Sequence, residues 1–194
     1  GLAAVGVNTD LAPVADVGHP GSFMGSRTFP GGSAQVAQAA CQFAAGLNAG
    51  GVNATLKHFP GLGYALKNTD TATAIVRQSG SALAADLVPY RTCQPQLVMV
   101  SNATYPALDP SGPAVFSRRI VRGLLRDQLG YPGVVISDSL TATSVTSPTT
   151  AVRAAQAGVD MLLYIEPAVS ALAYQKVLAA ARDGRLRRSA VQAS

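Results

Sequence analysis

The sequence predicts an α/β fold built from repeated strand–helix units. Short apolar runs rich in β-branched residues alternate with helical patterns along the chain of 194 residues. The runs are apolar at both odd and even positions, which is typical of parallel strands buried on both faces. Such units form either an open doubly wound sheet or a (β/α) barrel. No GxGxxG and no Walker A motif follows any run, and this favours the barrel.

Five segments are expected to supply the strands. The first is the apolar run Val5–Val7, which leads into residues 11–14. The others are Val52–Leu56, Leu97–Val100, Val134–Ile136 and Met161–Ile165. Because units of this kind connect by right-handed crossovers, all five strands should run in the same direction.

Four helices are expected between and after these strands. The first has Ser33 as its N-cap and ends at Gly50–Gly51, with a buried face of Val36, Ala40, Phe43 and Leu47. The second is capped by Ser117 and ends at Gly130, with a buried stripe of Ile120, Val121, Leu124, Leu125 and Leu129. The last two span Thr149–Gln156 and Ala168 to about Arg182. No break in composition divides the chain, so residues 1–194 are predicted to form a single domain.

Composition narrows the class of protein. Hydrophobic residues make up 48% of the chain and charged residues 13%, which is enough apolar material for a sizeable core. The net charge of +5 comes largely from arginines in residues 118–126 and 182–188, which we interpret as solvated helix faces. Aromatic residues are 6% and Trp is absent, so nucleic acid is not an expected partner. No apolar run has the length of a membrane span.

The two cysteines leave one question open. Cys41 and Cys93 lack the spacing of metal ligands. Cys41 falls on the first expected helix, where we interpret it as a small core residue. A disulfide between the two is an alternative in a secreted protein, and the sequence does not decide between these readings.

Polar side chains follow every expected strand. They are Asp16 after the first, Lys57 and His58 after the second, Ser101 and Asn102 after the third, Ser137 and Asp138 after the fourth, and Glu166 after the fifth. The active sites of such barrels lie at the carboxyl ends of the strands, so these residues predict one site on a shared rim. Glu166 precedes Pro167 and is better interpreted as a helix-start residue.

The residue types narrow the chemistry of this site. The set holds carboxylates, Lys57, His58 and a candidate Arg27, but no pair of histidines at zinc-ligand spacing and no G-x-S-x-G motif. Carboxylates with cationic donors suit a neutral, polyhydroxylated ligand, and one carboxylate can attack a sugar carbon. The pattern therefore favours a glycosidase that needs neither a metal nor an organic cofactor.

Five motifs carry a resemblance to a known family. They are GVNTDLAPVADV (6–17), GSRTF (25–29), LKHFPGLG (56–63), VMVSNATYPALDP (98–110) and GVVISDSL (133–140). In this order they resemble glycoside hydrolase family 3, and most closely its β-N-acetylhexosaminidase-like branch. The resemblance implies a TIM-type (β/α)₈ barrel, a terminal β-linked saccharide as substrate, and an extracellular or cell-envelope location in a bacterium.

The resemblance also implies roles for individual residues. Asp138 would be the nucleophile that forms a covalent glycosyl-enzyme, so that the configuration of the sugar is retained. Lys57 and His58 would bind sugar hydroxyls. Arg27 and Asp16 would line or support the sugar pocket.

Two positions depart from the pattern of that branch. The loop after KHFPG commonly carries Asp-Ser-His as the acid/base, whereas this chain has Asn68, Thr69 and Asp70. We expect Asp70 to serve as the general acid, buried enough to keep its carboxyl protonated. Asn102 stands where the branch has a histidine, and we expect it to bind substrate.

Length is a third departure. A barrel of this type needs about 250 residues. We therefore expect a partial barrel that lacks its first strands and needs an N-terminal segment to close it. Two alternatives to a β-N-acetylhexosaminidase stay open: a β-glucosidase-like hydrolase of the same family, and a non-catalytic sugar-binding or vestigial barrel.

Overall fold

The computed structural model describes residues 1–186, and its main sheet is entirely parallel. Its strands are β1 (Thr9–Asp10), β2 (Asn53–Phe59), β3 (Leu97–Val100) and β6 (Val134–Ser137). Their order across the sheet is β1-β2-β3-β6, so each strand pairs with the one before it in the chain. This confirms the predicted α/β fold with parallel strands.

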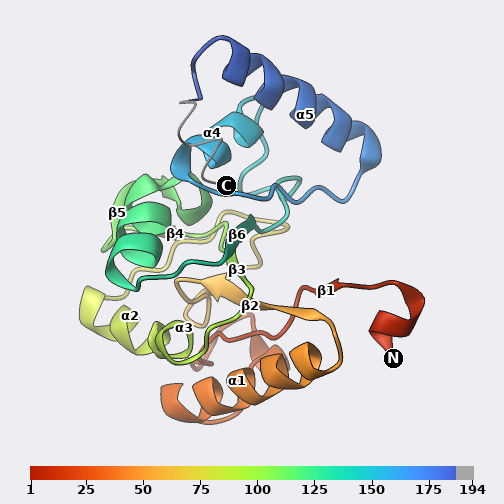
Figure 1. The fold of residues 1–194 in the computed structure, drawn as a ribbon. Helices are drawn as coiled ribbons and strands as arrows, with labels where there is room; N and C mark the ends of the chain where they lie inside the picture. The colour runs from red at the N-terminus through yellow and green to blue at the C-terminus, as the bar shows by residue number, and fades with distance from the viewer. Residues whose placement is uncertain (187–194) are drawn as a thin grey trace.

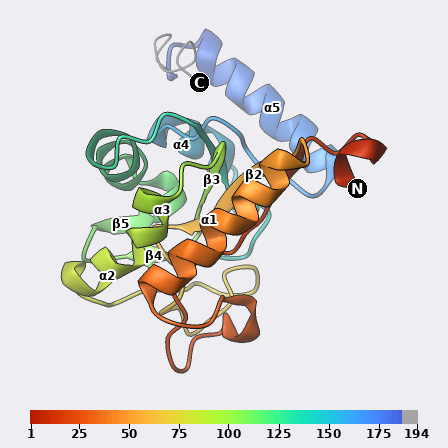
Figure 2. The ribbon, with the colours of Figure 1, turned by 60° about the horizontal axis from the view of Figure 1, so that its bottom comes forward.

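The α-helices lie in two groups on either side of the strands (Figure 1). In the first group, α1 (Ser33–Ala49) packs on β2 and on α3 (Val88–Thr92), and α2 (Gly80–Asp86) lies beside α3; the second group, α4 (Thr150–Ala157) and α5 (Pro167–Arg182), lies beyond β6. Figure 2 brings α1 to the front, where it runs along β2 and beside α3.

Shorter elements complete the chain. A π-helix, η4 (Arg119–Gln128), precedes β6. Three 3-10 helices are η1 (Leu2–Val5), η2 (Gly25–Arg27) and η3 (Ala114–Phe116). A small antiparallel pair joins β4 (Thr104–Tyr105) to β5 (Asp109–Pro113).

The central strands are buried on both faces, as their apolar sequences predict. In β3 and β6, Val98, Val100 and Val135 belong to the large core cluster that includes helix residues such as Ala40. The alternate residues Leu97, Met99 and Ile136 form a second, smaller cluster with Leu11 and Leu163. Side chains alternate between the two faces of a strand, so the two clusters lie on opposite sides of the sheet.

Two of the five predicted strands are wrong or incomplete. Val5 ends the helix η1, and Gly6 caps that helix with a left-handed φ of 84°, so residues 5–7 form no strand. Residues 161–165 run beside β6 but pair only through an isolated bridge between Ile136 and Met161. Ile165 is 70% exposed, and this lack of cover explains why the segment does not form a regular buried strand.

The helices match their predicted spans, with corrections at α1. Ser33 is the first helical residue and not the cap, because Gly32 holds the N-cap position. Phe43 was expected in the core but is 43% exposed, whereas Val36 and Ala40 are buried. Arg118 and not Ser117 holds the N-cap position of η4, although the Ser117 Oγ accepts a hydrogen bond from the Ile120 N–H at 3.1 Å in the first turn. The predicted stripe of η4 packs on the core.

Cys41 and Cys93 form a disulfide. It joins α1 to the residue that ends α3, and Cys93 is buried. The interpretation of Cys41 as a simple core residue is therefore wrong, and the alternative that the sequence left open holds. Among the described residues, no helix combines the length and the apolar character needed to cross a membrane. Part of the second arginine cluster, residues 187 and 188, lies outside the described residues.

Candidate active site

One small cavity brings together five of the seven predicted site residues. Its volume is about 130 Å³, and it lies where β2 and β6 end. The predicted residues that line it are Arg27, Lys57, His58, Asp70 and Asp138. The remaining wall consists of Leu11, Phe23, Leu62, Asn68, Thr69, Met99 and Leu163. Asp16 and Asn102 do not line it.

A bulge in β2 explains how two successive residues reach the same cavity. In a regular strand the side chains of Lys57 and His58 would point to opposite faces. Here the pairing with β3 shifts, because Lys57 pairs with Met99 and Phe59 pairs with Val100, which leaves His58 unpaired. Such a shift redirects the side chain of the extra residue. Both residues lie within the strand, and not after it as the sequence predicted.

Asp16 holds His58 from behind. Its side chain is fully buried, and its Oδ2 lies 2.7 Å from His58 Nδ1. Its Oδ1 accepts hydrogen bonds from the backbone N–H groups of His58 at 3.1 Å and Leu62 at 2.7 Å. A carboxylate can only accept, so Nδ1 carries the proton and Nε2 is the nitrogen left for a ligand. Asp16 therefore orients a residue of the cavity wall from behind, and its role toward a substrate stays a prediction.

Charges of both signs surround Lys57. Burial lowers the pKa of Lys57, and the positive charge of Arg27 lowers it further. The negative charges of Asp138, Asp10 and Asp16 act in the opposite direction. Lys57 thus lies near charges of both signs, and it lines the cavity together with Arg27 and Asp138, which is an arrangement that can bind a polar, neutral ligand through directed hydrogen bonds.

Asp138 is fixed by the backbone on either side of it. Its N–H donates to Val100 O at 3.0 Å, which continues the pairing of β6 with β3 by one residue. Its Oδ1 accepts a hydrogen bond from the Ser139 N–H at 2.7 Å. The side chain is half-buried and lines the cavity. One carboxylate oxygen is therefore engaged, while Oδ2 takes part in no hydrogen bond that the described residues supply.

Asn102 supports this same segment. It is buried, and its Nδ2 donates to Ser139 O at 2.8 Å. The amide therefore braces the turn that follows Asp138, and the expected contact between Asn102 and substrate stays a prediction. Its Oδ1 has no hydrogen-bond partner among residues 1–186.

Asp70 reaches the cavity from a loop that the chain after Asp138 holds in place. Thr143 N–H donates to Asp70 O at 3.0 Å, and Ser144 N–H donates to Thr69 O at 3.3 Å. Asn68 Oδ1 accepts from the Asp70 N–H at 3.0 Å and shapes the turn. Asp70 is exposed, so the burial that the sequence analysis expected for this carboxyl is wrong.

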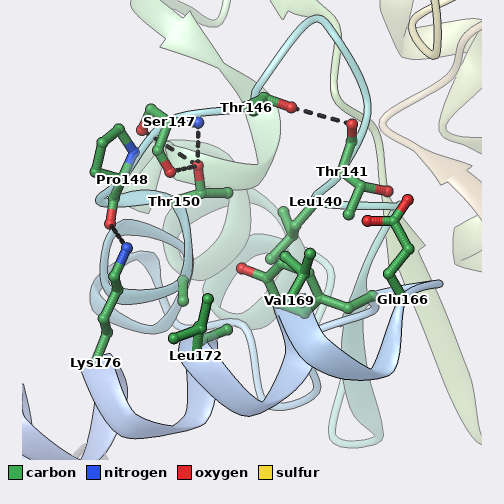
Figure 3. Close-up of a pocket in the computed structure, with 13 residues that line it drawn as sticks. Leu140, Thr141, Thr146, Ser147, Pro148, Thr150, Glu166, Val169, Leu172 and Lys176 are labelled. Carbon is green, nitrogen blue, oxygen red and sulfur yellow. Dashed lines mark hydrogen bonds between the residues drawn. The ribbon is translucent and has the colours of Figure 1, made fainter.

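A second cavity lies apart from these residues, between the loop after Asp138 and α5 (Figure 3). Its volume is about 260 Å³, and Leu140, Tyr164, Val169 and Leu172 contribute to its wall. Of the residues that follow the predicted strands, it contains Glu166 alone. Glu166 occupies the N-cap position of α5, as the sequence predicted. The larger cavity therefore lacks the clustered ionisable groups of the smaller one.

Sequence reasoning missed two parts of the site. The apolar wall around Met99 and Leu163 could not be assigned without the sheet. A contact between His19 and Asp86, which does not line the cavity, was also missed. A signal for it was present, because Asp86 follows Leu83 by three residues and so places a carboxyl on the buried face of α2. No group of three or more His, Cys, Asp or Glu side chains within residues 1–186 is arranged to hold a metal ion.

Comparison with known proteins agrees with this geometry. A β-hexosaminidase of Pseudomonas aeruginosa is 38% identical over 202 aligned residues, which cover 96% of this chain and 60% of that protein. A secreted glycosyl hydrolase of Arthroderma benhamiae, described as uncharacterized, is 40% identical over 175 residues, which cover 84% of this chain and 50% of that protein. The chain thus spans half to three fifths of the length of these curated relatives.

Solved structures are similar over almost all of this chain. The family 3 β-N-acetylglucosaminidase of a Paenibacillus species matches 99% of it with a TM-score of 0.95 and 31% identity, and the match takes up 39% of that protein. The β-N-acetylhexosaminidase of Beutenbergia cavernae matches 99% with a TM-score of 0.91 and 35% identity, over 62% of its own length. The glycosyl hydrolase family 3 N terminal domain matches residues 1–194, and the chain belongs to that family.

Proposed function

We propose that the protein to which this chain belongs is a retaining glycoside hydrolase that removes terminal β-linked sugars, with N-acetylhexosaminides as the preferred class. The observation that carries the proposal is the small cavity itself. It joins the carboxylates of Asp138 and Asp70 to the donors Arg27, Lys57 and His58. The activities for which the relatives from Pseudomonas, Paenibacillus and Beutenbergia are named support the choice of sugar.

In this proposal Asp138 is the nucleophile. Its free carboxylate oxygen attacks the anomeric carbon, the bond to the leaving oxygen breaks, and a covalent glycosyl-enzyme forms. Asp70 donates a proton to the leaving oxygen and later takes one from the water that releases the sugar. Because each of the two displacements inverts the anomeric centre, the product retains the configuration of the substrate.

The cationic groups hold the sugar in place. Arg27 and Lys57 donate to hydroxyl or carbonyl oxygens, and His58 offers Nε2 because Asp16 engages Nδ1. Since the chain itself supplies these groups, the proposed reaction needs no metal or organic cofactor.

We further propose that residues 1–194 form part of one catalytic (β/α) barrel of the TIM type. The four parallel strands, each followed by helical structure, are the units from which such barrels are built. The sheet has two edges, at β1 and beside β6, and further strands would close it. We expect these strands to come from a segment N-terminal to the ones described here.

An extracellular location is part of the same proposal. The Cys41–Cys93 disulfide requires an oxidising compartment, and the relative from Arthroderma benhamiae is described as secreted. The expected bacterial cell envelope stays a prediction.

A sugar-binding protein without hydrolytic activity is the second candidate. Two features favour it: the loop sequence Asn68-Thr69-Asp70 has no histidine to serve with the acid, and the Asp70 side chain is exposed. A β-glucosidase-like enzyme would differ from the main proposal only in the sugar that it accepts.

Hydrolysis of two aryl glycosides by the complete protein tests these alternatives. The substrates are an aryl N-acetyl-β-glucosaminide and an aryl β-glucoside. The test variant is Asp138→Asn. The matched control is Asp127→Asn, because the exposed Asp127 side chain lies on η4. The proposal expects turnover of the N-acetylated substrate by the wild type and the control, and loss of turnover in Asp138→Asn. Full turnover in Asp138→Asn would contradict it. Saccharide binding without hydrolysis would favour the second candidate.

A further inference from the structure

Asp86 is a buried carboxyl that the proposed reaction does not use. It is the last residue of α2, and its side chain is 0% exposed. It follows Leu83 by three residues, so the carboxyl lies on the same helical face as an apolar core residue. Its Oδ2 has no hydrogen-bond partner among the described residues. A buried polar group in this position is unfavourable for folding and calls for a functional explanation.

The contacts of Asp86 lead to two different loops. Its Oδ1 lies 3.3 Å from His19 Nε2, and the His19 ring stacks on the Tyr64 ring with centroids 3.3 Å apart and an angle of 14° between the planes. Its Cβ lies directly under Gly61, because a side-chain carbon added at Gly61 would be 2.6 Å from it. Gly61 also has a φ of 132°, which a residue with a side chain rarely adopts.

These two loops carry functional groups of the cavity. The loop with His19 continues to Arg27, and the loop with Gly61 and Tyr64 continues to Asp70. The loops are also joined directly, since the Phe23 N–H donates to Ala65 O at 3.0 Å. Asp86 therefore contacts both loops from a helix that belongs to neither of them.

We propose that Asp86 is a positioning residue: its carboxyl, seated against Gly61 and hydrogen-bonded to His19, holds the Arg27 loop and the Asp70 loop in their catalytic arrangement. This inference rests on the proposed glycosidase function. Asp86 acts through the two loops and does not touch the cavity, since it is absent from the cavity wall.

Electrostatics agrees with this geometry. Burial, with a smaller effect from the negative charge of Asp16, raises the pKa of Asp86 to about 7. Burial also lowers the pKa of His19. The ionisable groups around the carboxyl are Asp16, His19, Tyr64, Tyr90 and Tyr105. When Asp86 is protonated and the imidazole is neutral, the carboxyl O–H donates to His19 Nε2.

Above about pH 7 this arrangement changes. Asp86 becomes a buried carboxylate close to the negative charge of Asp16, and the hydrogen bond can persist only with His19 donating from Nε2. The contact that joins the two loops then holds a buried negative charge, which is unfavourable and weakens it. The positioning role thus implies that catalysis weakens as the pH rises through the pKa of Asp86.

The pH profile of kcat/KM for the complete protein tests the inference, with Asp86→Asn and Asp86→Ala as the variants. The Asn amide has the same shape and donates to His19 at every pH, so Asp86→Asn should keep near wild-type kcat/KM at about pH 6 and lose the wild-type decline above about pH 7. Asp86→Ala should lower kcat/KM by about tenfold to a hundredfold at all pH values, because small displacements of catalytic groups cost that much. A decline in Asp86→Asn identical to that of the wild type would overturn the inference.

Hydrogen exchange gives a readout that does not depend on turnover. In Asp86→Ala, exchange should rise in residues 18–27 and 60–70 and stay unchanged in β3 and β6. The matched control is Asp127→Ala, which should leave all four segments unchanged. If the wild type shows no hydrolysis, the proposed function fails, and exchange alone then decides the inference. Unchanged exchange in both loops of Asp86→Ala would overturn it.

Discussion

The Cys41–Cys93 disulfide should supply a large part of the stability of this domain. The two cysteines are 52 residues apart in the chain, and the bond closes a loop of that length. The chain-entropy relation for such a loop predicts a loss of about 4 kcal/mol in the free energy of unfolding when the bond is removed. Domains of this kind have total stabilities of about 5–15 kcal/mol, so the reduced protein should be markedly less stable.

Urea unfolding followed by far-UV circular dichroism measures this difference. The oxidised protein is compared with the same protein under a reductant, since this comparison changes no side-chain volume in the core. A Cys41→Ala/Cys93→Ala double variant should resemble the reduced protein and should not respond to the reductant. At low temperature, turnover should not change, because neither cysteine lines the catalytic cavity. A reduced protein within about 1 kcal/mol of the oxidised one would refute the entropic reasoning.

Three further perturbations have defined outcomes. Asp70→Asn should slow the hydrolysis of alkyl glycosides by about a hundredfold or more, because a general acid matters most for poor leaving groups. Aryl glycosides with good leaving groups should be affected much less. Equal effects on both substrates in a steady-state assay would argue against this role. Gly63→Ala should destabilise the protein by about 3 kcal/mol or more in urea unfolding, because the added carbon would overlap the Val17 carbonyl oxygen; an unchanged midpoint would contradict the packing described. The pKa of Asp86 rises from 3.8 to about 7 on folding, so the native state binds an extra proton between these values and the free energy of unfolding should fall, by up to about 4 kcal/mol, as the pH rises from about 4 to about 7. Asp86→Asn should flatten this dependence in unfolding curves recorded across that range, and a slope equal to the wild type would exclude Asp86 as its source.

The parts of the fold that sequence predicts well are those that local pattern determines. The spans of α4, α5, β3 and β6 follow from apolar periodicity and from glycines at helix ends, and these signals lie within each segment. The strand predicted at 161–165 does not form, because this segment pairs with β6 only at Met161 and has no cover at Ile165. Pairing and cover depend on other parts of the chain, so the sequence of the segment alone does not predict them.

Sequence likewise predicts one part of the site and misses another. Position after a strand was enough to bring Asp138 to the cavity, whereas Lys57 reaches the same cavity from within β2. It could not distinguish a residue in the cavity wall from one behind it, and only the structure shows that Asp16 and Asn102 brace His58 and Ser139. The β2 bulge was equally invisible, because it is a relation between the registers of two strands and not a property of either sequence.

The strand order has a consequence for how the chain acquires its structure. Every pairing in the main sheet joins residues far apart, as in Thr9 with Asn53 and Leu97 with Val134, so each strand must wait for an entire crossover before it can pair. Such non-local pairing slows folding. The spatial order β1-β2-β3-β6 is also the order of synthesis, so each strand leaves the ribosome after the strand with which it pairs. The sheet can therefore grow from one edge during translation, and its growing edge always belongs to the newest strand.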